Sequence, residues 1–215
     1  MDYSPTIEIY NEYNEAITFI RIEIEQNYFL FREIIEKTYA NLTEDYLKAK
    51  KEFEQSIQKE KIENKLILIQ HYSELLNEKA ALIPQFIFKS LYLSIYGFYE
   101  SILFNDYILK VLTSTKPANF NIDSFKLILE SKNIIIDFSL FDIYRQIRNS
   151  FVHRNGHIRS NFNRESVNKF KSLELVDDKF IIQKVIFIKE FLIYINEFTE
   201  NILIETERKC FQRTD

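Results

Sequence analysis

The sequence predicts an all-α fold: a helical bundle with a long N-terminal antiparallel helix pair and a small β-hairpin near residues 173–182. The 215 residues include only two glycines and three prolines, and neither residue occurs between Pro5 and Pro84. Sharp turns are therefore few. Apolar residues recur at steps of three and four, as on one face of a helix.

The length predicts a single domain over residues 1–215. Within it, residues 1–82 form the helix pair, an elaboration on a core of residues 83–210 that contains a helix at 139–154. No internal repeat or low-complexity segment divides the chain.

The first helix is predicted from about Thr6 to Tyr39 because its apolar residues recur at helical spacing. The stretch Asn41–Glu44 resembles a break, with Thr43 as the N-cap of a second helix that runs to about Ala81. The middle of this second helix, from Lys48 to Lys65, is highly charged, which is typical of a solvated helix face.

Pro84 suits the first turn of a third helix, predicted to reach Leu112 and to lie centrally because it is apolar on nearly all sides. A loop at 113–119 follows. Asp123 is predicted to cap a short helix to about Glu130, and residues 133–138 to form an extended link.

Ser139 is predicted to cap the next helix, which ends at Asn155-Gly156, a typical helix stop. After a polar, irregular stretch at 157–168, two short apolar runs flank Asp177-Asp178 and predict a β-hairpin of residues 173–176 and 179–182. The last helix is predicted from Gln183 to Arg208.

The composition excludes several classes of protein. The net charge of −4 argues against coating nucleic acid over a broad surface, so any RNA contact should be local. The lone Cys210 permits no disulfide within the chain and no cysteine-based metal site. No stretch has the length of a transmembrane helix and no secretory signal begins the chain, so we expect a cytoplasmic protein with no membrane partner.

The helix from Ser139 carries the candidate chemistry. At 100° per residue, its apolar residues share an inward face: Leu140, Tyr144, Ile147 and Phe151. On the opposite face Asn149 and His153 are four residues apart and therefore adjacent. Arg148 sits on the flank, where its long side chain can reach the same site.

The surrounding charge is distinctive for an acidic chain. The segment 144–164 contains no Asp or Glu and five arginines: Arg145, Arg148, Arg154, Arg159 and Arg164. Arginine's fork suits phosphate. The alternative is that these arginines pair with acidic helices elsewhere in the chain.

These residue types fit metal-free RNA cleavage. A histidine can move a proton near neutral pH, and an arginine can hold a phosphodiester and offset charge that develops on it. RNA supplies its own nucleophile, the 2′-hydroxyl. One histidine is scant for a reaction that needs an acid and a base, but a twofold dimer would supply two.

The segment Arg148–Gly156 resembles the signature of the HEPN superfamily: an arginine, commonly followed by Asn, Asp or His, then a histidine four to six residues after the arginine. The aromatic stretch Tyr96–Glu100 is a further similarity to stand-alone members. The resemblance covers the short motif and, more loosely, residues 81–208, and leaves the N-terminal pair unexplained.

The resemblance implies a homodimer with the motif helices lining a composite active site. It also implies a metal-independent endoribonuclease, without cofactor, acting as a toxin or anti-phage effector, with an antitoxin or other regulatory protein as a further partner. Arg148 and His153 would be catalytic and Asn149 would assist. Toxins paired with a nucleotidyltransferase antitoxin often carry a tyrosine two places after the histidine, but here that residue is Asn155.

Four further residues are candidates for RNA binding: Arg145, Arg154, His157 and Arg159. Glu100 could support the site by orienting an arginine, although a glutamate beside aromatics more often marks the polar edge of a helix. Two alternative functions stay open. One is a non-catalytic helical module for dimerisation or binding, and the other is a substrate-binding partner of a nucleotidyltransferase.

Overall fold

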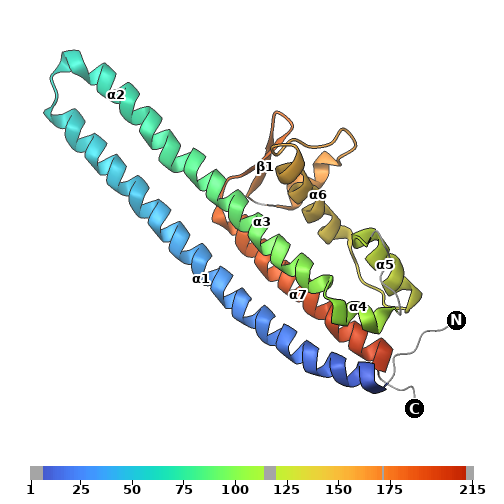
Figure 1. The fold of residues 1–215 in the computed structure, drawn as a ribbon. Coiled ribbons are helices and arrows are strands. Elements are labelled where there is room, and N and C mark those ends of the chain that lie inside the picture. The colour runs from blue at the N-terminus through green and yellow to red at the C-terminus, as the bar shows by residue number, and fades with distance from the viewer. Residues whose placement is uncertain (1–6, 114–119, 171, 212–215) are drawn as a thin grey trace. The chain divides into compact units, whose positions relative to one another are not determined.

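The computed structural model describes residues 7–113, 120–170 and 172–211. It confirms an all-α fold with one small antiparallel hairpin (Figure 1). The helical elements, in chain order, are α1 (Ile7–Lys59), α2 (Ile62–Asn77), the π-helical turn η1 (Glu78–Leu82), α3 (Ile83–Leu103), α4 (Asp106–Leu112), α5 (Ile122–Ser131), α6 (Ser139–His153), the 3-10 helix η2 (Arg164–Lys169) and α7 (Val185–Phe211). The strands are β1 (Leu173–Val176) and β2 (Lys179–Ile182).

The chain divides into two compact units, each built from separate stretches of sequence. The first unit comprises Met1–Leu30, Ile95–Asp142 and Leu192–Asp215, and the second comprises Phe31–Ser94 and Ile143–Phe191. Four helices contribute residues to both units: α1, α3, α6 and α7.

The core of the first unit is rich in aromatic rings. Phe141 stacks on Phe198 with ring centroids 4.8 Å apart, and Tyr99 donates a hydrogen bond to the side-chain oxygen of Asn196 at 2.9 Å. Arg21 on α1 reaches two glutamates of α7, Glu200 at 3.5 Å and Glu207 at 3.0 Å. Within this unit, ring stacking therefore joins α6 to α7, a hydrogen bond joins α3 to α7, and the charged network joins α1 to α7.

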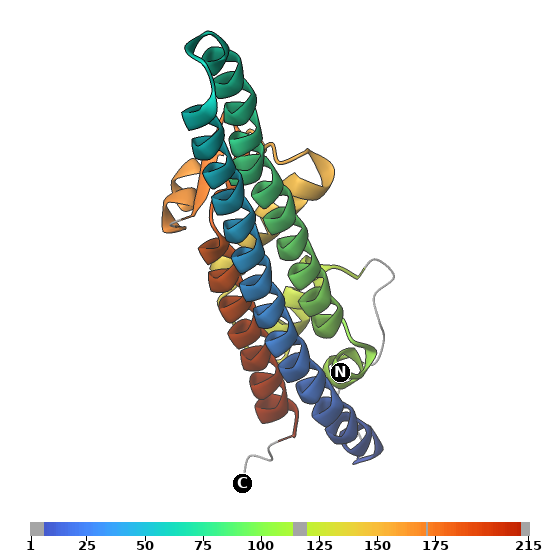
Figure 2. The same ribbon diagram turned by 90° about the vertical axis from the view of Figure 1, so that its left-hand side faces the viewer.

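In the second unit the later part of α1 lies beside α2, and the two views of the ribbon agree on this (Figures 1 and 2). The rings of Phe53 and Tyr72 are 5.2 Å apart, and the hydroxyls of Ser56 and Tyr72 lie at 3.4 Å. The predicted antiparallel helix pair is present, but the predicted break at Thr43 is wrong. Helix α1 continues to Lys59, and the Thr43 hydroxyl donates to the carbonyl of Tyr39 within this helix instead of capping a new one.

Three predicted helix starts and stops also differ. The third helix ends at Leu103, and the side chain of Asn105 caps the separate helix α4 by accepting the N–H of Tyr107. Asn121, rather than Asp123, caps α5. Asp137 accepts the N–H of Ser139, so Ser139 is the first helical residue of α6 and not its cap. Residues 114–119 of the predicted loop lie outside the described residues.

Tyr92 is the centre of the second unit's core. Its side chain is 0% exposed, and the centroid of its ring lies within 6.5 Å of the ring centroids of several aromatic residues, among them Tyr144, Phe151, Phe187 and Phe191. Its hydroxyl donates to the backbone carbonyl of Tyr144 at 2.6 Å. This buried hydrogen bond fixes the middle of α6 to α3.

The β-hairpin has the predicted residues and turn. Leu173 pairs with Ile182 and Val176 with Lys179, which leaves Asp177 and Asp178 as a two-residue loop. Both loop residues have positive φ, as a type I′ turn requires. Among the described residues, no helix is long and apolar enough to cross a membrane.

Candidate functional site

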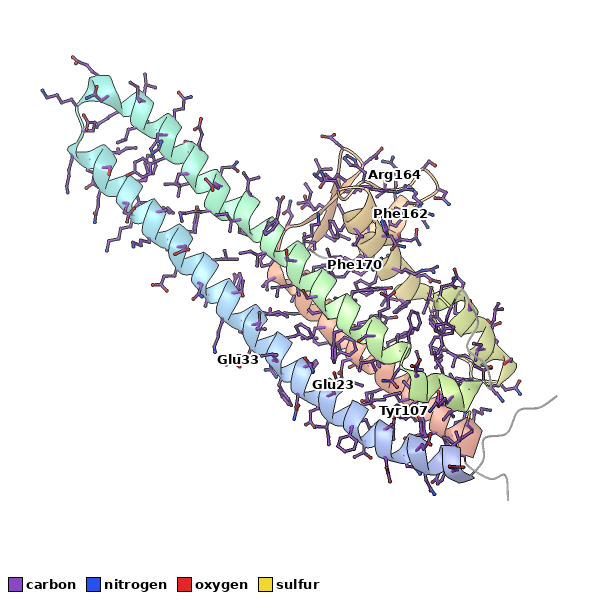
Figure 3. The ribbon with its side chains drawn as sticks, viewed as in Figure 1. Glu23, Glu33, Tyr107, Phe162, Arg164 and Phe170 are labelled. Atoms are coloured by element: carbon purple, nitrogen blue, oxygen red, sulfur yellow. The ribbon has the colours of Figure 1, made fainter. Side chains whose placement is uncertain are left out.

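Helix α6 presents its apolar face inward, as its periodicity predicted. Tyr144, Ile147 and Phe151 are buried, whereas Leu140, the fourth residue of the predicted face, is half-buried. Tyr144 lies against Phe170 and Phe191 with ring centroids 5.1 and 4.7 Å apart. Figure 3 marks Phe170 together with Phe162 and Arg164 on the segment that follows α6. Because this inner face is fixed by packing, the outer face of α6 has a defined orientation within the second unit.

The motif residues lie on the outer, polar side of α6. Arg148 and Asn149 are half-buried, and the Arg148 guanidinium donates to the side-chain oxygen of Asn149 at 3.1 Å. His153 is exposed, one turn after Asn149. In the part of the chain that the structure describes, His153 makes no hydrogen bond or ion pair, so its ring is accessible to a ligand.

The end of α6 is fixed by a tight turn. Asn155 and Gly156 have φ values of 51° and 92°, and the Gly156 N–H donates back to the carbonyl of Ser150 at 2.8 Å. The Gly156 carbonyl in turn accepts the N–H of Phe180 on β2 at 3.0 Å. The sequence signal Asn-Gly therefore ends the helix as predicted, and backbone hydrogen bonds attach this end to the hairpin.

The other predicted RNA-binding residues lie on α6 and just after it. Arg145 is half-buried on α6, whereas Arg154, His157 and Arg159, which follow the helix, are exposed. His157 forms a β-bridge with Lys179. All four residues belong to the same unit as the motif.

The arginine cluster is only partly neutralised by acids of the chain. Arg164 forms an ion pair with Asp178 at 2.6 Å. Over residues 7–113, 120–170 and 172–211, no ion pair involves Arg154 or Arg159. Arg164 thus pairs with an acid of the hairpin turn and not of a helix, and the alternative of pairing with acidic helices does not describe Arg154 or Arg159 either.

Glu100 and the motif residues belong to different compact units of the chain. Glu100 is a half-buried residue of α3 in the first unit, whereas Arg148 and His153 belong to the second. The prediction that Glu100 orients a motif arginine therefore stays a prediction.

Sequence reasoning missed a cavity of about 220 Å³ whose lining includes Phe151 and Asn155, two residues that flank His153 in the chain. Two lysines line it, Lys89 from α3 and Lys179 from β2. They are 90 residues apart in sequence, so no local pattern could have associated them.

Comparison with known proteins adds no relative to this description. No family model, no curated protein and no solved structure matches the chain. The residues of α6 and their surroundings are therefore the basis on which a function is inferred.

Proposed function

We propose that the protein is a metal-independent endoribonuclease that acts as a toxin or anti-phage effector. The observation that carries the proposal is the arrangement of three side chains on α6. Arg148 and Asn149 are hydrogen-bonded to each other and reach the surface, and the exposed His153 follows one turn later. In this proposal the Arg148 guanidinium binds phosphate and His153 transfers a proton, in a segment that contains arginines and no acids.

The proposed chemistry uses the substrate's own nucleophile. His153 accepts the proton of a ribose 2′-hydroxyl, and the 2′-oxygen forms a bond to the adjacent phosphorus. The bond from phosphorus to the 5′-oxygen breaks, and that oxygen takes up a proton. The products are a 2′,3′-cyclic phosphate and a 5′-hydroxyl end, and Arg148 offsets the charge that develops on the phosphate oxygens.

Asn149 has a positioning role in this proposal. Its side-chain oxygen accepts a hydrogen bond from the Arg148 guanidinium, which limits where that fork can point. An arginine oriented before substrate binds loses less conformational freedom when it grips a phosphate. The side-chain amide N–H groups of Asn149 can donate to the substrate at the same time.

A second copy of the chain completes the proposal. The 5′-oxygen needs a proton donor while the 2′-hydroxyl needs an acceptor, and α6 carries one exposed histidine at the motif. A twofold dimer that pairs two α6 surfaces would supply both groups from two His153 side chains. The exposure of His153 is compatible with such an arrangement.

The test is cleavage of end-labelled RNA by purified protein in the presence of a chelator. We expect His153→Ala to lose about 100-fold or more in rate, because general acid–base catalysis contributes on that order. His71→Ala is the matched control, since His71 is an exposed histidine of α2. Cleavage that survives His153→Ala unchanged would refute the proposal.

Mixed dimers test the composite site directly. A purified heterodimer of one wild-type and one His153→Ala chain should lose nearly all of the activity, because it keeps only one of the two histidines that the shared site needs. A heterodimer with half of the wild-type rate would refute the shared site. In bacteria, we expect growth arrest from the intact gene and none from His153→Ala. A protein without cleavage activity would correspond instead to a binding or dimerisation module.

A further inference from the structure

The 220 Å³ cavity beside the end of α6 has a lining suited to part of a nucleic acid. It is open between α3, the end of α6 and β2, all within the second unit. The residues used below are Gln85, Phe86 and Lys89 of α3, Phe151 and Asn155 at the end of α6, and Lys179 of β2.

The cavity has a positive lining. Of the described residues that line it, Lys89 and Lys179 are charged and none is an acid. Among the described residues neither lysine forms an ion pair. Two ammonium groups without carboxylate partners favour an anion.

Both lysines are held in place by packing of their side chains. The Lys89 ammonium lies 5.6 Å from the centroid of the Phe151 ring, a cation–π distance. The Lys179 side chain crosses Gly156 so closely that a Cβ there would lie 3.1 Å from its Cγ and 3.3 Å from its Cε. The glycine that ends α6 thus makes room for a lysine of the cavity.

An aromatic surface lies beside these charges. The Phe86 side chain is 72% exposed although it is large and apolar. Bases of single-stranded RNA stack on such rings, and the amides of Gln85 and Asn155 offer both donors and acceptors to base edges. A nucleotide is a ligand that offers both a phosphate to the lysines and a flat ring to Phe86.

The size of the cavity favours a nucleotide that belongs to a longer chain. Cavities for whole small-molecule ligands usually measure about 300–1,000 Å³. At 220 Å³ this cavity suits one portion of a ligand that continues outside it. Asn155, which also lines the cavity, follows His153 by two residues, so an RNA strand leaving the cavity at the end of α6 starts near the motif histidine.

We propose that this cavity is a nucleotide subsite that holds the RNA beside the bond to be cleaved. This inference rests on the proposed nuclease function and adds a substrate-positioning site to it. Lys89 and Lys179 contact backbone phosphate, and Phe86 stacks on a base.

Binding of a non-cleavable strand tests the subsite without catalysis. The probe is fluorescein-labelled oligoadenylate with 2′-O-methyl riboses, which cannot attack the phosphate, and the readout is fluorescence anisotropy over a series of salt concentrations. We expect Lys89→Gln with Lys179→Gln to weaken binding and to lower the salt slope by about 0.7 for each lost phosphate contact. The matched control is Lys169→Gln with Lys184→Gln, two exposed lysines of the same unit that lie outside the cavity.

The stacking contact has its own variant pair. Phe86→Ala should weaken binding about fivefold or more, because one base–aromatic stack contributes at least that much. Phe19→Ala is the control, since Phe19 is also 72% exposed but lies on α1 in the first unit. Both replaced rings are largely exposed, so we expect both variants to fold.

Several results would overturn the subsite. One is an equal loss of affinity in the two lysine double variants, which would indicate a general charge effect. A second is unchanged binding of oligoadenylate by the cavity variants. A third is effective competition by adenosine 5′-monophosphate alone, which would indicate a site for a free mononucleotide. A fourth is a loss of binding to oligoglutamate, an acidic peptide, in lysine variants that still bind oligoadenylate.

The outcome separates this inference from the nuclease proposal. If the wild type does not cleave RNA but its binding depends on Lys89 and Lys179, the nuclease proposal fails and nucleotide recognition stands. If cleavage depends on His153 while the cavity variants bind and cleave normally, the subsite alone fails.

Discussion

Replacing Tyr92 by phenylalanine should measure how strongly α6 is held in the second unit. The substitution keeps the ring among its four aromatic neighbours and removes only the hydroxyl that donates to the Tyr144 carbonyl at 2.6 Å. A net hydrogen bond of this kind contributes about 1 kcal/mol to the free energy of unfolding. For a chain of this length, that lowers Tm by about 2–4 °C.

The assay is thermal unfolding followed by circular dichroism at fixed protein concentration. Tyr107→Phe is the control, because Tyr107 is 44% exposed and its loss of a hydroxyl should change stability by less than about 0.5 kcal/mol. Tyr92→Ala, which also removes the ring, should cost about 3–5 kcal/mol. A Tyr92→Phe melting point no lower than that of Tyr107→Phe would refute the anchoring role of this hydrogen bond.

Gly156→Ala should destabilise the protein by about 1 kcal/mol or more in the same assay, because φ is 92° there, whereas Gly97→Ala, with no neighbour of its Cβ within 4 Å, should be neutral or stabilising. Three tyrosines have a pKa raised by burial above the ordinary 10.0: Tyr13, Tyr99 and Tyr194. The folded protein keeps phenolic protons that the unfolded chain releases, so the denaturant midpoint should fall as pH rises above 10, and a midpoint that stays constant would contradict this. Burial also raises the pKa of the Cys210 thiol, so iodoacetamide should label it more slowly in the native protein than in denaturant, and equal rates would show the thiol to be accessible.

Local signals in the sequence predicted the parts of the fold that local interactions determine. Asp177-Asp178 between two short apolar runs specified the hairpin and its turn. The periodicity of α6 separated its buried face from its polar face, and Asn155-Gly156 marked its end. In each case the residues that decide the structure are close in the chain.

The helix boundaries show where local signals fail. Thr43 followed by Glu44 has the composition of an N-cap, yet the same hydroxyl bonds equally well to a carbonyl one turn back inside a helix. The true end of α1, at Lys59, has no glycine or proline, and Lys61 caps α2 without a side-chain hydrogen bond. Only packing along the helix pair decides between the two positions.

In the candidate site, too, some residues could be predicted from local sequence and others could not. Arg148, Asn149 and His153 were predictable because one helix carries all three. Lys89 and Lys179 meet at one cavity only after α3, α6 and the hairpin have packed together, so their proximity depends on tertiary structure. Glu100 belongs to the other compact unit, so no local pattern associates it with the motif either.

The hairpin turn has a practical consequence for protein engineering. Both Asp177 and Asp178 adopt left-handed backbone angles, with φ values of 47° and 62°, which Asn-Gly accommodates with less strain. The Asp178 carboxylate pairs with Arg164 on the surface, where an exposed ion pair contributes little. Replacing Asp177-Asp178 by Asn-Gly should therefore raise the free energy of unfolding and leave every candidate RNA-contacting side chain in place. Such a variant would suit crystallisation or directed evolution.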